Sequence, residues 1–194
     1  LTSIASFADK NKEEIPDIND LDPVLKAKVH FWIDVYTKYT TEEGLIHDAK
    51  YPEIIYEKIS LKPNIADFKL APRQQKRKSQ ARVDEIKNFY KKLLLSIHKK
   101  QQKLESLTEA EKRVYELFKN INETNKFFSA AHNKRIRLQL GQKDRFLQGL
   151  FYSGRYLPIM EKIFKDRKVP YDITRLPFVE SSFNLRARSK VGAS

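Results

Sequence analysis

Apolar side chains recur at intervals of three and four residues through most of this chain, and that spacing constrains its fold more than any other feature. The first stripe covers residues 23–39, where Asp22 is placed to cap a helix that begins with proline. A longer stripe with near-heptad spacing covers residues 83–107. Thr108 and Glu111 then form a capping-box pattern, which predicts that a new helix begins there after a hinge.

The segment 39–63 interrupts this periodicity with a glycine and a proline. Its short β-branched and aromatic run at 54–56 fits either a strand or a helical turn. His47 stands beside Asp48, and the pair invites a catalytic or metal-binding interpretation. One histidine and one aspartate in a loop make a weak signal, so a structural hydrogen bond is the favoured role.

Residues 133–153 combine two patterns. The apolar residues up to Leu140 alternate as in a strand, whereas those that follow Gly141 keep helical spacing. We interpret the segment as mostly helix, interrupted or closely packed at Gly141. Ser153 and Gly154 then predict a helix end.

A further helix is expected to follow and to end before Pro170. Asp172 is then placed to cap the last helix, and Pro177 should kink it because proline has no N–H to donate. The whole pattern predicts a mainly α chain with at most a little sheet.

The charge balance limits the kinds of partner. The chain has 38 basic and 25 acidic residues, a net charge of +13 at pH 7, which attracts nucleic acid, anionic lipid headgroups and anionic cell-wall polymer. Five basic residues fall within residues 73–82, but this run has no aromatic side chain for base stacking and matches no nucleic-acid module. A solvated basic loop or helix face is favoured, and no nucleic-acid partner is expected.

Cysteine is absent, which excludes disulfides and thiolate metal sites, and no metal or cofactor is predicted. No run approaches the roughly 18 apolar residues that a membrane span needs. The first residues lack the basic and apolar regions of a signal peptide. For an exported protein we expect that signal, and any lipid-anchoring cysteine, upstream of Leu1.

One carboxylate in an apolar stretch is the candidate that carries chemistry. Residues 176–184 read LPFVESSFN, and on a helix Glu180 lies at the edge of the apolar stripe. Partial removal from water favours the protonated form of a carboxyl, which can then donate its proton as a general acid. The alternative is a boundary residue that forms an ion pair with Arg175 or Arg188.

The residues around this glutamate form a set of motifs: Leu-Pro before it, the Glu-Ser pair with Ser181, Phe-Asn at 183–184, and Ser-x-x-Gly-Ala at 189–193. With these motifs, residues 154–194 resemble the start of the catalytic domain of lytic murein transglycosylases. The match is best to the membrane-bound lytic murein transglycosylase D type, within the goose-lysozyme-like class. Three upstream segments also resemble the N-terminal region of some members: FWIDVYT (31–37), LIHD (45–48) and LQLGQKDRFLQGL (138–150).

The resemblance implies a fold and a reaction. A helical N-terminal region, residues 1–135, would pack on the first helices of a lysozyme-like (α+β) catalytic domain, residues 136–194. Glu180 would protonate the glycosidic oxygen between N-acetylmuramic acid and N-acetylglucosamine, then accept the proton of the muramoyl C6 hydroxyl as a 1,6-anhydro ring closes. Ser181 would support the substrate. The substrate's own groups would replace the second carboxylate of most glycosidases, and the residues alone do not choose between ring closure and hydrolysis.

The chain departs from the family pattern in two places. Leu185 stands where many members have proline. A Gly-Leu-Trp-Gln-like segment and the groove helices that follow in the family are absent after 192–194, so we expect an incomplete catalytic domain. The resemblance implies peptidoglycan glycan strands as partner, and the periplasm or outer membrane of a Gram-negative bacterium as location. The alternative is a non-catalytic helical module that binds or scaffolds the cell wall.

Overall fold

The computed structural model of the chain describes residues 17–132, 134–184 and 187. Within them the chain is mainly helical with a small three-stranded sheet, which confirms the predicted mainly α class. The α-helices are α1 Pro23–Thr37, α2 Pro72–Lys100, α3 Glu109–Leu117, α4 Lys126–Ala130, α5 Lys143–Asp166 and α6 Leu176–Glu180. The strands are β1 Glu43–Asp48, β2 Ile55–Ser60 and β3 Ile136–Leu140, and the short 3₁₀ helices are η1 Ile18–Asp20, η2 Ile65–Lys69, η3 Leu104–Ser106 and η4 Tyr171–Arg175.

The sheet is antiparallel and has β1 at its centre, with the strand order β2-β1-β3. The run at 54–56 therefore leads into a strand, which resolves the choice between strand and helical turn. The prediction that residues 133–153 are mostly helix is wrong for 136–140, because pairing with β1 satisfies the backbone of that segment and buries Ile136. Gly141 is closely packed as expected: a Cβ there would lie 2.2 Å from the carbonyl oxygen of Tyr39.

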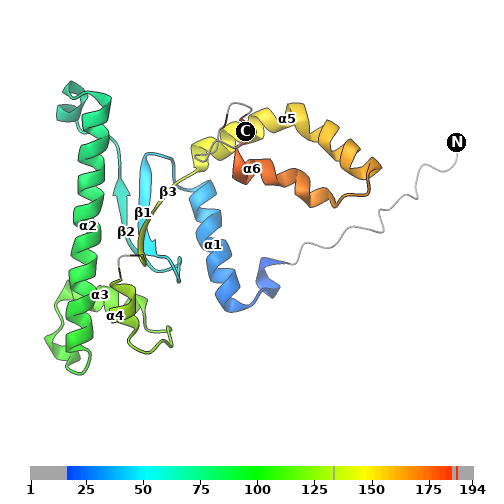
Figure 1. Cartoon of the computed structure of the whole chain (residues 1–194). Helices are drawn as coiled ribbons and strands as arrows, with labels where there is room; N and C mark the ends of the chain where they lie inside the picture. The colour runs from blue at the N-terminus through cyan, green and yellow to red at the C-terminus, as the bar shows by residue number, and fades with distance from the viewer. Residues whose placement is uncertain (1–16, 133, 185–186, 188–194) are drawn as a thin grey trace, which may run out of the picture.

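Two helices sandwich this sheet, with α2 on one face and α1 on the other (Figure 1). Successive strand residues point to opposite faces. Leu45 accordingly packs with Phe31 and Val35 of α1, whereas Ile46 belongs to the larger core formed with α2. The N-terminal region that the sequence predicts as helical thus also holds a sheet.

The larger core is formed by one face of α2 together with the sheet, α3 and α4. Tyr56 of β2 stacks on Tyr90 and on Phe118, with ring centroids 5.3 and 6.3 Å apart. Two predicted caps are confirmed: Asp22 accepts hydrogen bonds from two backbone N–H groups of α1, and Thr108 and Glu111 form a capping box on α3. The predicted cap at Asp172 is wrong, because Asp172 lies inside η4, which begins after Pro170. We call residues 23–140 the sheet unit.

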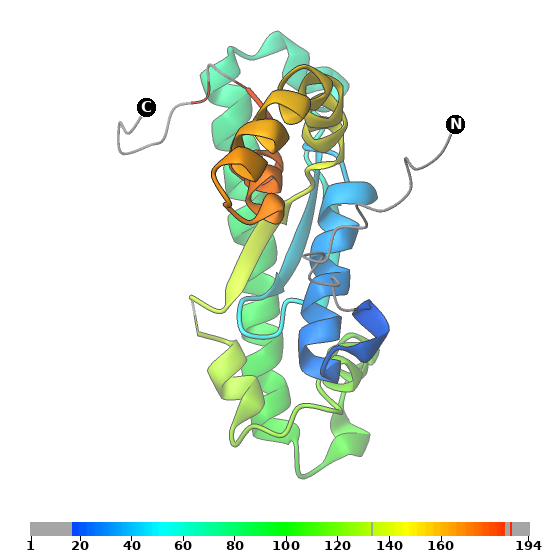
Figure 2. The same ribbon diagram turned by 90° about the vertical axis from the view of Figure 1, so that its right-hand side faces the viewer.

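The C-terminal helices form a hairpin, residues 143–180, at one end of the molecule (Figures 1 and 2). The predicted helix end at Ser153 and Gly154 is wrong, because α5 continues to Asp166. Aromatic contacts on both sides of the glycine hold the helix: Phe146 meets Phe178, and Tyr156 stacks on Phe183.

The last predicted helix is divided in two at residues 175 and 176, into η4 and α6. Pro177 lies in the first turn of α6. A missing N–H costs nothing at that position, so the expected kink is replaced by the start of a new helix. The predicted division of the chain at 135 and 136 stays a prediction. β3 lies just after that point and pairs with β1 before it.

Candidate functional site

Glu180 is the last residue of α6, and its side chain is exposed. The expectation that apolar neighbours withdraw it from water is wrong for the described residues. Its neighbours Leu176 and Val179 are themselves 54% and 59% exposed, so they form no buried stripe beside it. The carboxylate is open to an approaching ligand.

Arg175, one of the two expected ion-pair partners, does not pair with Glu180. Arg175 instead donates to Glu161 of α5 at 2.7 Å and to the Tyr171 hydroxyl at 2.8 Å. Hydrogen bonding from Tyr171, and then from Arg175, lowers the pKa of Glu161. Arg188 lies outside the described residues. Arg175 therefore forms an ion pair that joins η4 to α5, in place of the expected one with Glu180.

The turn after Glu180 has an uncommon backbone. Ser182 and Phe183 have φ angles of 52° and 55°, in the left-handed region, which is strained for a residue as bulky as phenylalanine. Ser181 and Phe183 both donate their N–H groups to the carbonyl oxygen of Pro177, at 3.1 and 3.2 Å. Strain of this kind persists only where the surroundings fix it.

Those surroundings come from α5 and α6. The Phe183 ring is buried, lies parallel to Tyr156 and meets Phe178 edge-on at 4.7 Å between centroids. Gly149 of α5 lies directly under the turn, where an added Cβ would come within 3.2 Å of the Ser182 Cα. The backbone that follows the candidate acid is thus held against a helix.

The hairpin exposes many large apolar side chains, in contrast to the interior of the sheet unit. Phe151 alone is 82% exposed. The other exposed large apolar residues of the hairpin are Leu147, Leu150, Tyr152, Ile159, Ile163, Val169, Tyr171, Ile173, Leu176 and Val179. An exposed apolar surface of this extent is typical of a face that contacts another protein surface.

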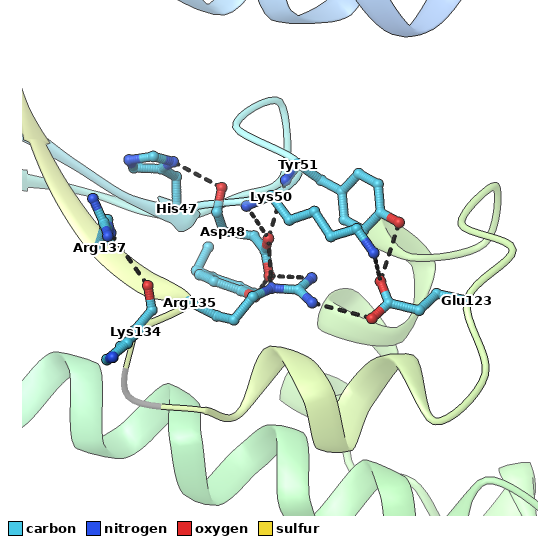
Figure 3. Close-up of polar contacts among 9 residues, drawn as sticks. His47, Asp48, Lys50, Tyr51, Glu123, Lys134, Arg135 and Arg137 are labelled. Carbon is cyan, nitrogen blue, oxygen red and sulfur yellow. Dashed lines mark hydrogen bonds and ion pairs between the residues drawn. The ribbon is translucent and has the colours of Figure 1, made fainter.

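The histidine and aspartate that drew attention in the sequence lie in the sheet unit (Figure 3). Asp48 is fully buried, and Arg135 contacts both of its carboxylate oxygens at 2.8–3.0 Å. Arg135 also pairs with Glu123 at 3.2 Å, and Glu123 accepts hydrogen bonds from Lys50 and from the Tyr51 hydroxyl. The result is a closed network that joins the end of β1 to the start of β3.

His47 is set apart from the charges of that network. Its Nδ1 lies 3.0 Å from the backbone carbonyl oxygen of Asp48, and its ring packs 4.8 Å from that of Phe31. Burial lowers the pKa of His47, which favours the neutral ring. The structural role favoured from the sequence agrees with this geometry. Among the described residues, no group of three or more histidine or acidic side chains is placed to hold a metal ion.

The chain was compared with family models, curated proteins and solved structures, and none of them matches it. Within the described part of the chain, no helix is both long and apolar enough to cross a membrane. The geometry of the hairpin and the motif around Glu180 therefore carry the functional argument.

Little of what surrounds the glutamate can be predicted from the sequence. Ser182 and Phe183 are not residues that favour positive φ, so no local pattern marks the strained turn. Gly149 offered a weak signal, because a glycine inside a helical pattern often marks close packing. The substrate-binding role of Ser181, which is half-buried, stays a prediction.

Proposed function

We propose that this chain is part of a peptidoglycan lytic transglycosylase and that Glu180 is its acid and base. The observation that carries the proposal is an exposed glutamate inside the transglycosylase-like motif, directly before a strained and packed turn. A general acid that acts on a large polymer must be reachable and held on a fixed backbone. In the proposal, the bound sugar and the rest of the domain remove the Glu180 carboxyl from water and so favour its protonated form.

The proposed reaction needs one carboxyl group used twice. Protonated Glu180 donates its proton to the oxygen that links muramoyl C1 to N-acetylglucosamine, and the C1–O bond breaks. The carboxylate then takes the proton from the muramoyl C6 hydroxyl, whose oxygen bonds to C1. The acid is regenerated, a 1,6-anhydro ring forms, and no water enters the product. Ser181 is placed beside the acid along the chain and would help to hold the sugar.

The exposed apolar face of the hairpin supports a second part of the proposal. A lysozyme-like domain needs further helices to complete its core and its substrate groove. The uncovered apolar side chains of α5, η4 and α6 provide a surface on which such helices can pack. We therefore assign a complete active site to the full-length protein and only the acid-bearing part of it to this chain.

The test is digestion of purified peptidoglycan by the full-length protein, followed by mass spectrometry of the released sugars. Products of ring closure lack the water that hydrolysis adds, so the mass identifies the reaction. Glu180→Gln should lower the rate by about a hundredfold or more, because the amide cannot donate the proton. Glu109→Gln, an exposed and remote control, should leave the rate unchanged.

Formation of anhydro products by Glu180→Gln at the rate of the unsubstituted protein would falsify the assignment of the acid. Binding of peptidoglycan without any cleavage by the unsubstituted protein would favour the non-catalytic cell-wall module.

A further inference from the structure

The sheet unit has two strongly basic stretches: residues 86–104, with six basic residues and no acidic one, and the stretch that leads into and begins α2. Between residues 60 and 82 the chain has seven basic residues and one acidic residue, a net charge of +6 out of +13 for the whole chain. We call these seven residues the basic end: Lys62, Lys69, Arg73, Lys76, Arg77, Lys78 and Arg82.

The first turns of α2 hold most of this charge and bury no side chain. Val83 is the first buried residue of the helix, so residues 72–82 have no core-packing role. Arg73, Lys76 and Arg77 are exposed and make no ion pair with any residue that the structure describes. Like charges this close repel one another, which destabilises the helix unless an anion is nearby.

A hollow of about 310 Å³ lies beside these turns, between α2 and the segment that follows β2. Its lining includes Lys62, Asn64, Gln75, Ser79, Arg82 and Glu85. Several of its charges already have partners: Lys78 pairs with Asp67, Lys62 with Glu42 at 3.2 Å, and Arg82 donates to the Ser60 carbonyl oxygen at 3.3 Å.

The chemistry of this lining fits a peptide that carries a free carboxylate. The exposed Arg73, Lys76 and Arg77 beside the hollow attract the carboxylate. Inside it, the amide and hydroxyl side chains can bond peptide N–H and C=O groups, and Glu85 can accept a bond from an amine. The lining has no aromatic ring on which a nucleic-acid base could stack, and its acidic side chains would repel closely spaced phosphates.

We propose that the basic end and its hollow bind the carboxylate-bearing peptide branches of the cell-wall polymer. This inference rests on the proposed function, because it makes peptidoglycan the source of those peptides. The start of α2 and the hairpin both lie towards the upper end of the molecule in the two views, on opposite sides of the sheet in Figure 1 (Figures 1 and 2). A long polymer that passes over this end can reach both, with its peptides on the basic end and its sugar at the glutamate.

Cosedimentation with purified peptidoglycan sacculi tests this binding. The chain carries Glu180→Gln throughout, so that cleavage does not alter the polymer. A triple variant, Arg73→Gln, Lys76→Gln and Arg77→Gln, should bind about tenfold more weakly at low salt, with a shallower dependence on salt. The control removes three exposed charges elsewhere, by Lys92→Gln, Lys99→Gln and Lys103→Gln, and should change binding less than twofold.

A second ligand separates peptide from sugar. An amidase removes the cross-linking peptides and so releases soluble glycan strands and free peptides, which serve as competitors. An excess of the peptides should displace the chain from intact sacculi, whereas an excess of the peptide-free glycan should not. Displacement by the glycan alone, or an equal loss of binding in the control variant, would overturn the proposal. Tighter, salt-sensitive binding to random-sequence DNA would also overturn it and assign the basic end to nucleic acid.

The two proposals fail separately. If Glu180→Gln cleaves as fast as the unsubstituted protein, the assignment of Glu180 as the acid is wrong, but peptide-dependent binding is unaffected. Loss of that binding removes the role of the basic end and leaves the cleavage assay unaffected.

Discussion

The sheet unit has a core of buried large apolar side chains, although some, such as Phe68 and Phe89, are exposed, whereas the hairpin buries no large apolar side chain and exposes most of its own. In the sheet unit, Phe118 and Phe127 are buried almost completely between α2, α3 and α4. In the hairpin, α5 has 24 residues, yet its buried positions are Gly149 and Ser153, neither of which is large and apolar. The same residue types therefore have different roles in the two regions: they stabilise the first and are available for contact in the second.

The hairpin is held in place by a few specific contacts in spite of this exposure. Tyr36 of α1 meets Phe146 of α5 edge-on, with centroids 5.8 Å apart. Asp144 accepts hydrogen bonds from the backbone N–H and the hydroxyl of Thr41, at 2.8 and 2.6 Å. These contacts attach the start of α5 to the sheet unit, and contacts among α5, η4 and the end of the chain around α6 hold the rest of the hairpin.

The largest expected difference between the two regions is in the stability lost when a phenylalanine of each, Phe118 or Phe151, is replaced by alanine. Phe118→Ala should lower the free energy of unfolding by about 3–5 kcal/mol, because it leaves a cavity among rings that cannot close around it. Phe151→Ala should change it by no more than about 0.5 kcal/mol, because that ring is in water. Urea unfolding followed by circular dichroism and by the fluorescence of Trp32 measures both. A similar cost for the two variants would show that the hairpin has a core of its own.

The second pair compares two arginine–carboxylate bonds. Asp48→Ala should cost about 3–5 kcal/mol, because it leaves Arg135, 14% exposed, with Glu123 alone and removes the acceptor of two backbone N–H groups. Glu161→Ala should cost about 1 kcal/mol or less, because Arg175 is 40% exposed and water replaces the bond.

Double-mutant cycles with Arg135→Met and Arg175→Met isolate each coupling. A coupling in the hairpin as large as that in the sheet unit would contradict the difference in burial between the two pairs.

Helical spacing predicted most of the elements, and the errors fall where long-range contacts decide. The predicted caps of α1 and α3 are confirmed because capping depends on residues that are close in sequence. The strand character of 136–140 required a partner about ninety residues away, and no local pattern specifies that pairing. The predicted break at Gly154 failed because aromatic contacts on both sides of it hold α5.

The candidate site was predictable only in part. The motif singled out Glu180 and the residues that follow it, but helical spacing placed the glutamate beside a buried stripe that α6 does not have. α6 is five residues long, and its Leu176 and Val179 side chains face water. Helical spacing therefore could not show which side of the segment is buried. The hollow at the basic end is formed by segments from both sides of η2, and the sequence shows only its charge.

Two glycines give the third comparison. Gly141→Ala should destabilise the protein by roughly 1–3 kcal/mol, because the new Cβ meets the backbone of Tyr39 and Thr40, which cannot move aside as a flexible side chain can. Gly154→Ala should stabilise it by about 0.5–1 kcal/mol, because nothing lies within 4 Å and alanine favours helix. Thermal unfolding of both variants shows whether each substitution raises or lowers the stability of the protein. A destabilised Gly154→Ala would mean that this face of α5 is already covered.

The smallest expected effect is a change in the free energy of unfolding with pH. We compare it at Glu111 and at Glu161. Burial disfavours the ionised form of Glu111, but hydrogen bonds from Ser96, Thr108 and Lys100 outweigh it and lower the pKa to about 2. A carboxyl with a lowered pKa in the folded state stabilises the protein above its unfolded pKa, near 4.5, and this contribution is lost as the pH falls towards 2.

The free-energy difference between the unsubstituted chain and Glu111→Gln should therefore shrink from about 1–2 kcal/mol at pH 7 as the pH falls below 4.5. Glu161 also has a lowered pKa, through Tyr171 and then Arg175, but it lies at the surface of the hairpin, where water and salt screen the interaction. Glu161→Gln should leave the pH dependence of the free energy of unfolding nearly unchanged. Any remaining change should be smaller at high salt. Equal acid sensitivity at the two positions would mean that the hairpin carboxylate is shielded from solvent, as it would be if the apolar face beside it were covered in solution.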